Sequence, residues 1–375
     1  MNAPANPLQK LAALGQSVWL DDIHRGMLNS GEFKSYVDDY AVTGVTSNPA
    51  ILKSAILDHK DYDKEIVALA RERADAARAY ETLAIEDLRR AADTLRPVYD
   101  RTDALDGYVS LEVSPLLARD TAASIDAGRR LWRALDRPNT MIKIPATVEG
   151  IPAVRTLIAE GINVNVTLLF SLARYRDAAR AYLDGLNDRQ RAGQPLHRVA
   201  SVASFFMSRI DSLVDERLDR LIQSDAAKQG QARELRGELA LASGKLAYQH
   251  FKRVFSSDDW KPLLAAGARP QRLLWASTST KDPAYPDTKY VEPLIGPQTV
   301  NTLPLKTLKA YRDHGDPAAR IELGADQAIL TLSRLAEVGV DLGECTRLLE
   351  EEGLQKFVEP FDLLLKTLEE RLQSV

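Results

Sequence analysis

The sequence predicts an α/β fold: a single (β/α)8 TIM barrel with additional helices, including a helical C-terminal region. Short apolar segments of strand length alternate with amphipathic segments of helix length, which indicates βαβ units and a parallel sheet. The number of strand–helix pairs is about eight, and that number favours a closed barrel. An open doubly wound sheet is the alternative, but no Gly-x-Gly-x-x-Gly follows the first strand.

The composition narrows the class of protein. The 375 residues are predicted to form one domain, 1–375, with the extra helices as elaborations of the barrel. A net charge of −4 means that the chain has no excess of positive charge with which to bind nucleic acid or an anionic membrane. Residues 1–7 lack the features of a signal peptide, and no apolar stretch is long enough to cross a membrane. The single cysteine, Cys345, excludes an internal disulfide, so we expect a cytoplasmic protein.

The predicted strands are apolar and end abruptly in polar residues or proline. Asn48-Pro49, for example, ends the second strand, because proline has no N–H to donate to a sheet. In chain order the predicted strands cover residues 17–22, 42–47, 107–113, 141–145, 162–169, 198–207, 272–277 and 299–303.

The predicted helices have apolar residues three and four positions apart. Glycines mark expected ends or breaks: Gly161 caps one helix, and Gly230, Gly324 and Gly339 interrupt others. The predicted helical regions cover residues 61–97, 121–135, 148–159, 174–186, 208–255 and 305–375.

The fourth strand carries a lysine in an apolar run. Alternation along a strand places Met141, Lys143 and Pro145 on one face and Ile142 and Ile144 on the other. Burial there would favour a neutral amine, which can attack a ketone and form a Schiff base. A lysine whose stem lies along the core while its ammonium reaches solvent is the alternative.

Polar residues follow nearly every predicted strand, at the end of a barrel where catalytic residues lie. Any one of them could be a helix cap or a turn residue. Taken together with the lysine, however, they favour a catalytic site. They supply two carboxylates for proton transfer, neutral groups for a polyhydroxy substrate, and a phosphate site at the start of a helix. The candidates, in that order, are Asp21 and Glu112; Asn48, Asn165, Thr167 and Ser204; and Arg209, Ser277 and Lys281.

These motifs resemble the transaldolase family, which is of the class I aldolase type, and they resemble its longer subgroup in particular. The resemblance covers about residues 17–304, with the motifs in the family's order. The matching stretches are Val-Trp-Leu-Asp at 18–21, Gly-Val-Thr-Ser-Asn-Pro at 44–49, Leu-Glu-Val at 111–113, Ile-Lys-Ile-Pro-Ala-Thr at 142–147, Asn-Val-Asn-Val-Thr-Leu-Leu-Phe at 163–170 and Ser-Phe-Phe-Met-Ser-Arg at 204–209.

The resemblance implies a role for each candidate. Lys143 would form the Schiff base with the ketose C2 carbonyl, and Asp21 would exchange the proton of the C4 hydroxyl. Glu112 and Thr167 would hold a proton-shuttling water. The remaining candidates would bind the substrate: Asn48, Asn165 and Ser204 its hydroxyls, Phe206 by shaping the pocket, and Arg209 and Ser277 its phosphate. Many members have an arginine where Ser279 to Lys281 lie here, so Ser279 or Lys281 would complete the phosphate site.

The implied reaction transfers a dihydroxyacetone unit from sedoheptulose 7-phosphate or fructose 6-phosphate to glyceraldehyde 3-phosphate or erythrose 4-phosphate, in the non-oxidative pentose phosphate pathway. The phosphorylated ketose and aldose are the expected partners. No cofactor is expected beyond the covalent adduct, and five scattered histidines give no metal-ligand spacing. Alternatives are a simple aldolase with the same lysine and a non-catalytic sugar-phosphate-binding barrel. The sequence is compatible with a homo-oligomer.

Overall fold

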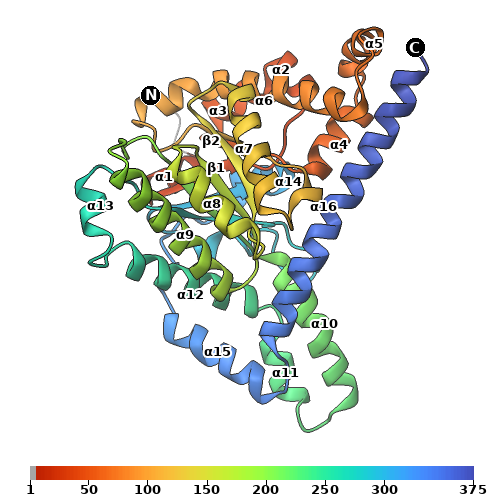
Figure 1. The fold of residues 1–375 in the computed structure, drawn as a ribbon. Helices are drawn as coiled ribbons and strands as arrows, with labels where there is room; N and C mark the ends of the chain where they lie inside the picture. The colour runs from red at the N-terminus through yellow and green to blue at the C-terminus, as the bar shows by residue number, and fades with distance from the viewer. Residues whose placement is uncertain (1–5) are drawn as a thin grey trace, which may run out of the picture.

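Eight parallel strands close into a barrel in sequence order, β1 to β8, in a computed structural model that describes residues 6–375 (Figure 1). The closed (β/α)8 barrel is therefore confirmed, and the open doubly wound alternative is wrong. Residues 1–5, most of the N-terminal stretch that was compared with signal peptides, lie outside the described residues. The strands are β1 (Gln16–Leu20), β2 (Val42–Thr46), β3 (Tyr108–Glu112), β4 (Thr140–Pro145), β5 (Val164–Leu169), β6 (Ser201–Phe206), β7 (Arg272–Ala276) and β8 (Thr299–Leu303).

Helices follow the strands and cover the outside of the barrel. None of the helices in the described part of the chain is long and apolar enough to span a membrane. They are α1 (Pro7–Ala13), α2 (Arg25–Ser30), α3 (Glu32–Asp39), α4 (Pro49–Asp58), α5 (Asp63–Arg71), α6 (Ala76–Arg101), α7 (Thr121–Leu135), α8 (Gly150–Ala159), α9 (Leu172–Arg191), α10 (Ser208–Ser224), α11 (Gln229–Leu235), α12 (Leu239–Val254), α13 (Lys261–Ala265), α14 (Leu305–His314), α15 (Ala325–Glu337) and α16 (Leu342–Gln373), with short 3-10 turns at Lys60–Tyr62, Pro115–Leu117 and Glu292–Leu294.

Side-chain caps start several of these helices where the sequence turns from strand to helix. The side chain of Asn48 accepts hydrogen bonds from the backbone N–H groups of Ala50 and Ile51, with Pro49 as the first helical residue. Asp120 caps α7 in the same way. Such caps satisfy backbone donors that a helix leaves free at its start, and they fix where each strand end turns away from the barrel.

The structure corrects several predicted helix boundaries. The region 61–97 divides into α5 and α6, and α6 continues through Pro97 to Arg101, because Val98 and Tyr99 are buried against the barrel. The long region 208–255 breaks around 225–228 and 236–238, and Gly230 instead lies inside α11. Short helices α1 to α4 were not predicted, since few of their apolar residues show a clear period. Breaks at Gly324 and Gly339 are confirmed, and both residues have a positive φ.

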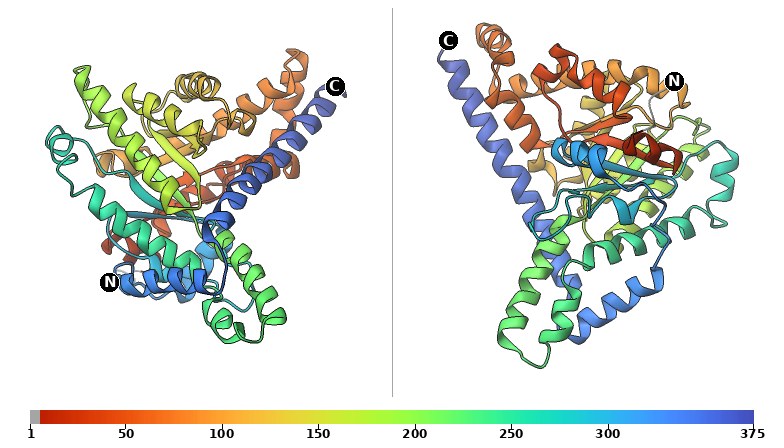
Figure 2. Two further views of the ribbon diagram at one scale, coloured as in Figure 1. Left: turned by 60° about the horizontal axis from the view of Figure 1, so that its bottom comes forward. Right: turned by 180° about the vertical axis from the view of Figure 1, so that it is seen from behind.

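The helix α16 packs across the end of the barrel at which the strands finish. It contacts α4, α6, α10 and β5, and it is the long blue helix in both views of Figure 2. Gly353 lets it approach closely: a Cβ there would lie 3.2 Å from the ring of Phe170 and 3.3 Å from Leu168. Leu168 itself has φ +62° at a register shift between β5 and β6. The helix α16 therefore packs closely against the end of β5.

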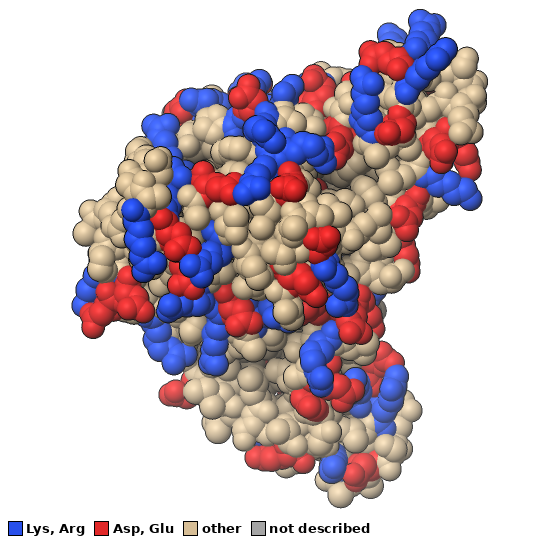
Figure 3. Space-filling model, viewed as in Figure 1, with Lys and Arg blue, Asp and Glu red and all other residues tan. Residues whose placement is uncertain are grey.

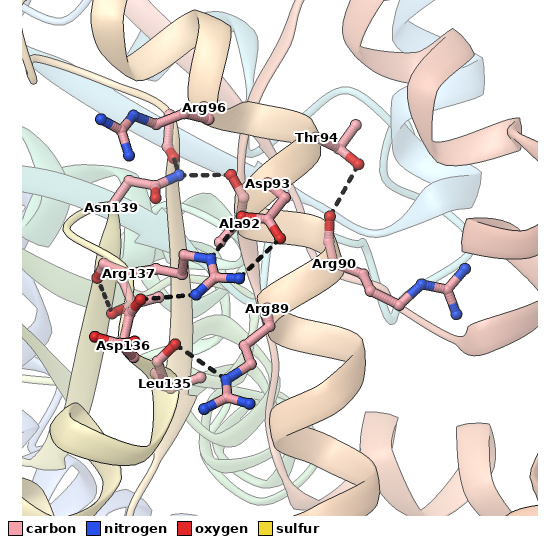
Figure 4. A network of polar contacts seen from close by, with 12 residues as sticks. Arg89, Arg90, Ala92, Asp93, Thr94, Arg96, Leu135, Asp136, Arg137 and Asn139 are labelled. Atoms are coloured by element: carbon pink, nitrogen blue, oxygen red, sulfur yellow. Dashed lines mark hydrogen bonds and ion pairs between the residues drawn. The ribbon is translucent and has the colours of Figure 1, made fainter.

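Polar contacts secure the opposite end, where the strands begin. Arg137, just before β4, pairs with both carboxylate oxygens of Asp93 on α6 at 2.6 and 3.1 Å (Figure 4). Asn139 donates from Nδ2 to the carbonyls of Ala92 and Gly107, both at 2.8 Å. The outer surface carries both signs of charge interspersed over the face in Figure 3.

Candidate active site

A cavity of about 320 Å3 opens at the carboxyl ends of the strands. Nine of the eleven residues predicted for the site line it, and they come from the ends of six strands and the turns that follow them. This is the position at which (β/α)8 barrels carry their chemistry. The nine are Asp21, Asn48, Lys143, Thr167, Ser204, Phe206, Arg209, Ser277 and Lys281.

Lys143 is buried inside the barrel, with its side chain 6% exposed. Its ammonium nitrogen donates to the carbonyl of Ser47 at 2.9 Å and lies 3.0 Å from Glu112 Oε2. Register explains the second contact, because Glu112 and Lys143 are paired positions on β3 and β4. The alternative of a lysine with a solvated head is wrong. The apolar run around Lys143 gives no indication that a carboxylate lies beside its amine.

Glu112 is the carboxyl that can exchange a proton with this lysine. Burial raises the pKa of Glu112, while the nearby Lys143 lowers it and Asp21 raises it further. None of the described residues donates a hydrogen bond to its other oxygen, Oε1. A buried carboxyl with a raised pKa and a close amine is suited to general acid–base catalysis.

Asp21 follows β1 and lines the same cavity. Its backbone N–H still bonds to the carbonyl of Leu303 at 2.9 Å, which fixes the turn. Thr46 donates to its Oδ1 at 2.6 Å, and the Thr46 hydroxyl also contacts that of Thr302 at 2.7 Å. Burial raises the pKa of Asp21, and the Thr46 hydrogen bond followed by Lys143 partly offsets this. The second carboxylate is thus held in place and kept able to accept a proton.

Asn165 does not line the cavity. It is the register partner of Lys143 on β5 and is fully buried. Ser204 donates to its Oδ1 at 2.7 Å, and its Nδ2 donates to Ser110 Oγ at 3.1 Å. In contrast, the buried hydroxyl of Thr167 lines the cavity and has no hydrogen-bond partner among residues 6–375.

Two cations and two hydroxyls collect at one end of the cavity. Arg209, in the first turn of α10, lies with its guanidinium 5.5 Å from the ring centroid of Phe206. Its Nη1 is buried without a hydrogen-bond partner in the described chain. Burial lowers the pKa of Arg209, and Asp21 and Glu352 oppose this. An arginine that is desolvated, unpaired and at a helix start is suited to binding an anion.

Lys281 completes this cationic end. Its ammonium donates to Ser279 Oγ at 2.7 Å, and burial, together with the nearby Arg209, lowers its pKa. Ser277 has a positive φ of 54°, and its hydroxyl contacts Ser208 Oγ at 2.9 Å. A non-glycine residue in the left-handed region at a strand end is strained, which is common at ligand sites.

Six further residues line the cavity that were not among the eleven predicted site residues: Thr46, Ala276, Ser279, Thr302, Pro304 and Phe357. Thr46, Ser279 and Thr302 are polar residues at or near strand ends, and that position was an available signal. Phe357 comes from α16, and its ring centroid lies 5.7 Å from the Lys143 ammonium nitrogen. No local pattern could have placed it there. Within residues 6–375, no cluster of three His, Cys, Asp or Glu side chains could hold a metal ion.

Comparison with a family model and comparison with individual protein sequences indicate the same family. The model of the family described as Transaldolase/Fructose-6-phosphate aldolase matches residues 18–368. A transaldolase of Thermobifida fusca is 48% identical over 370 residues, which cover 98% of this chain and 99% of the relative. A transaldolase of Saccharopolyspora erythraea is 46% identical over 98% of both chains, and transaldolase 2 of a Nostoc species is 44% identical over the same shares.

Proposed function

The chain belongs to the family of transaldolases and fructose-6-phosphate aldolases, and on this premise we propose that Lys143 forms the covalent Schiff base of the reaction. The enzyme is a transferase of the class I aldolase type. It transfers a dihydroxyacetone unit from a ketose phosphate to an aldose phosphate, a reaction of the non-oxidative pentose phosphate pathway. The observation that carries the assignment is the buried Lys143–Glu112 pair, 3.0 Å apart, at the substrate cavity.

Glu112 moves the protons of Schiff-base formation. It takes a proton from the Lys143 ammonium, so that a neutral amine attacks the C2 carbonyl. After a proton passes from nitrogen to oxygen in the adduct, Glu112 gives its proton, relayed by the water that it holds with Thr167, to the hydroxyl, which leaves as a separate water molecule. The nitrogen lone pair forms the C=N bond. The products are an iminium ion, a carboxylate and one water molecule, so the charges balance.

Asp21 cleaves and remakes the carbon–carbon bond. It accepts the proton of the C4 hydroxyl while the electrons of the C3–C4 bond move toward the iminium, which releases an aldose phosphate and leaves an enamine on Lys143. The enamine then attacks the aldehyde of the acceptor, and Asp21 returns the proton. The hydrogen bond from Thr46 leaves the second carboxylate oxygen, Oδ2, free for this exchange.

The neutral residues recognise the hydroxyls of the substrate. The side-chain oxygen of Asn48 is used to cap α4, so its NH2 group is the part that can reach the substrate. The hydroxyl proton of Ser204 is donated to Asn165, so Ser204 accepts from the substrate and Asn165 acts mainly through Ser204. Thr167, with Glu112, holds the water of the proton transfers.

The phosphate binds at the cationic end of the cavity. Arg209, Lys281 and Ser277 would surround it, while Phe206 supports the guanidinium of Arg209. Lys281 thereby takes the place of the arginine that many relatives have there. Transfer instead of simple aldol release requires that water not reach the enamine, and Phe357 of α16 covers the Schiff-base lysine.

Borohydride reduction in the presence of fructose 6-phosphate tests the assignment. We expect a reduced adduct on the peptide that contains Lys143, because borohydride traps an iminium. Lys281→Ala serves as the matched control, since it removes the other lysine of the cavity and should keep the adduct. No adduct, or an adduct on Lys281, would refute the assignment.

The acceptor requirement separates a transferase from an aldolase. With fructose 6-phosphate alone, we expect one enzyme equivalent of glyceraldehyde 3-phosphate and little free dihydroxyacetone. Adding erythrose 4-phosphate should start steady turnover. Continuous release of dihydroxyacetone without an acceptor would instead favour the simple aldolase.

Four further proposals concern the domain organisation, the cofactor, the cellular location and the oligomeric state. We propose one domain over 1–375, which a single buried hydrophobic cluster from Leu8 to Leu368 supports. The enzyme uses no cofactor, since Lys143 supplies the electron sink. The free, buried Cys345 favours the cytoplasm. The homo-oligomer stays a prediction.

A further inference from the structure

A second cavity, of about 200 Å3, lies between β3, α6, α7 and α16 and reaches Glu112. Glu112 lines this side cavity but does not line the substrate cavity. Lys143 lines the substrate cavity but not the side cavity. The Lys143 ammonium nitrogen and Glu112 Oε2 are 3.0 Å apart. The ion pair therefore separates two cavities. Helix α16 is a wall of both, through Phe357 on the substrate side and Phe361 on the other.

The inner end of the side cavity is polar and unsatisfied. Glu112 is 4% exposed, and no described residue donates to its Oε1. The phenol of Tyr80 also lines this cavity, and burial together with the nearby Glu112 raises its pKa. A buried carboxyl oxygen without a donor is costly, and an ordered water is its usual partner when there is room and a second polar group.

The outer end of the side cavity reaches the surface. Leu116 is 58% exposed, and Glu81 is partly exposed. Between the two ends the walls are mostly apolar: Ala84, Leu131 and Phe361 line them, and the ring centroid of Phe361 lies 5.3 Å from that of Tyr80. A water next to Glu112 would thus have a short route to solvent through the side cavity that does not cross the substrate cavity.

The proposed function makes such a route useful. Each Schiff base releases one water at the oxygen that Glu112 protonates, and each hydrolysis consumes one. At those moments a phosphorylated sugar occupies the substrate cavity. We propose that the side cavity between α6 and α16 is the path by which this water enters and leaves, with Tyr80 as a residue that positions water at Glu112. This inference rests on the Schiff-base assignment and extends it.

Isotope exchange tests the path directly. Fructose 6-phosphate carrying 18O at C2 loses its label to solvent when the imine forms, provided that the released water escapes before hydrolysis. Ala84→Leu fills the side cavity from α6 with an apolar side chain. Ala76→Leu makes the same change on the same helix outside the cavity lining, and so serves as the matched control.

We expect Ala84→Leu to slow label loss roughly tenfold, less than the roughly 10²–10⁴-fold of general acid catalysis, because Glu112 remains in place. The KM for fructose 6-phosphate and the borohydride-trapped adduct on Lys143 should be unchanged. Tyr80→Phe, which keeps the ring, should slow label loss to a smaller extent. Ala76→Leu should behave as the wild type.

The outcomes distinguish an effect on the path of the water from an effect on Schiff-base formation. Unchanged label loss in Ala84→Leu that still forms the adduct would show that the water leaves through the substrate cavity, which overturns the proposal. Equal slowing in Ala76→Leu would mean a general effect on α6 and overturn it as well. Absence of the adduct in the wild type would refute the Schiff-base assignment itself. If Ala84→Leu does not fold, Tyr80→Phe decides, because it adds no volume.

Discussion

Buried charged groups at the two ends of the barrel differ in how many hydrogen-bond and ion-pair partners they have. Where the strands begin, Asp106 accepts from Trp19 Nε1 at 2.7 Å, from Thr43 at 3.0 Å and from Ser17, and the guanidinium of Arg272 lies 3.6 Å away. Arg272 in turn donates to Ser17 Oγ at 2.7 Å and to a backbone carbonyl at 2.8 Å. The charged groups at this end are surrounded by partners.

Where the strands finish, the charged groups are left partly free. Glu112 has Lys143 on one oxygen and no described donor on the other, and Arg209 has a buried nitrogen without a described partner. Buried polar groups normally find partners, so exceptions need an explanation. At this end we expect a substrate atom or water to be the missing partner, whereas at the other end we expect the satisfied charges to contribute to stability.

The largest expected effect is that of Lys143→Ala. We expect transfer and the borohydride adduct to be lost completely, because the variant lacks the amine to which the Schiff base is assigned. Glu112 would then be buried without a counter-charge, and its pKa is already raised. A raised pKa in the folded state gives stability that is present in acid and lost as the pH rises. The variant should therefore be less stable near about pH 8 than near about pH 5, as urea unfolding can measure.

Asp21→Asn separates the two chemical steps at the functional end. We expect turnover to fall about 10²–10⁴-fold, because carbon–carbon cleavage loses its base. The borohydride adduct on Lys143 should still form, since Glu112 serves that step. Rapid-quench measurement of the adduct and of aldose release distinguishes the two. Loss of the adduct would contradict the role assigned to Asp21.

Asp106→Ala examines the opposite end. It leaves Arg272, whose side chain is 8% exposed, without its carboxylate, and removing one partner of a buried pair costs about 3–5 kcal/mol. Urea unfolding should show that loss, while kcat of the folded variant stays at the wild-type value. An intact stability with reduced kcat would break the distinction between the ends.

The smallest expected effect is that of replacing Thr46, and Thr43 on the same strand provides its control. Thr46→Val removes a hydrogen bond that lowers the pKa of Asp21, so the acid limb of the pH profile of kcat/KM should shift to higher pH. Thr43→Val is the matched control at the other end of β2, where the hydroxyl bonds to Asp106. It should reduce stability by about 1 kcal/mol and leave the acid limb unchanged. A shift in both profiles would contradict the comparison.

The sequence alone determined the eight strands and most of the candidate site. Period-two alternation reports which side chains share a face, so Lys143 and Asn165 could be placed inside the barrel before any contact was known. Polar residues at strand ends could likewise be assigned to one rim, because all the strands of such a barrel point the same way.

Tertiary structure alone decided which of these groups touch. The pairing of Glu112 with Lys143 depends on the register of β3 against β4, and Asn165 does not line the cavity but accepts a hydrogen bond from Ser204, which does. Phe357 covers the lysine only because α16 packs across the strand ends. Local patterns record the environment of a side chain but not its partner. Partners distant in the sequence are chosen by the packing of the whole chain.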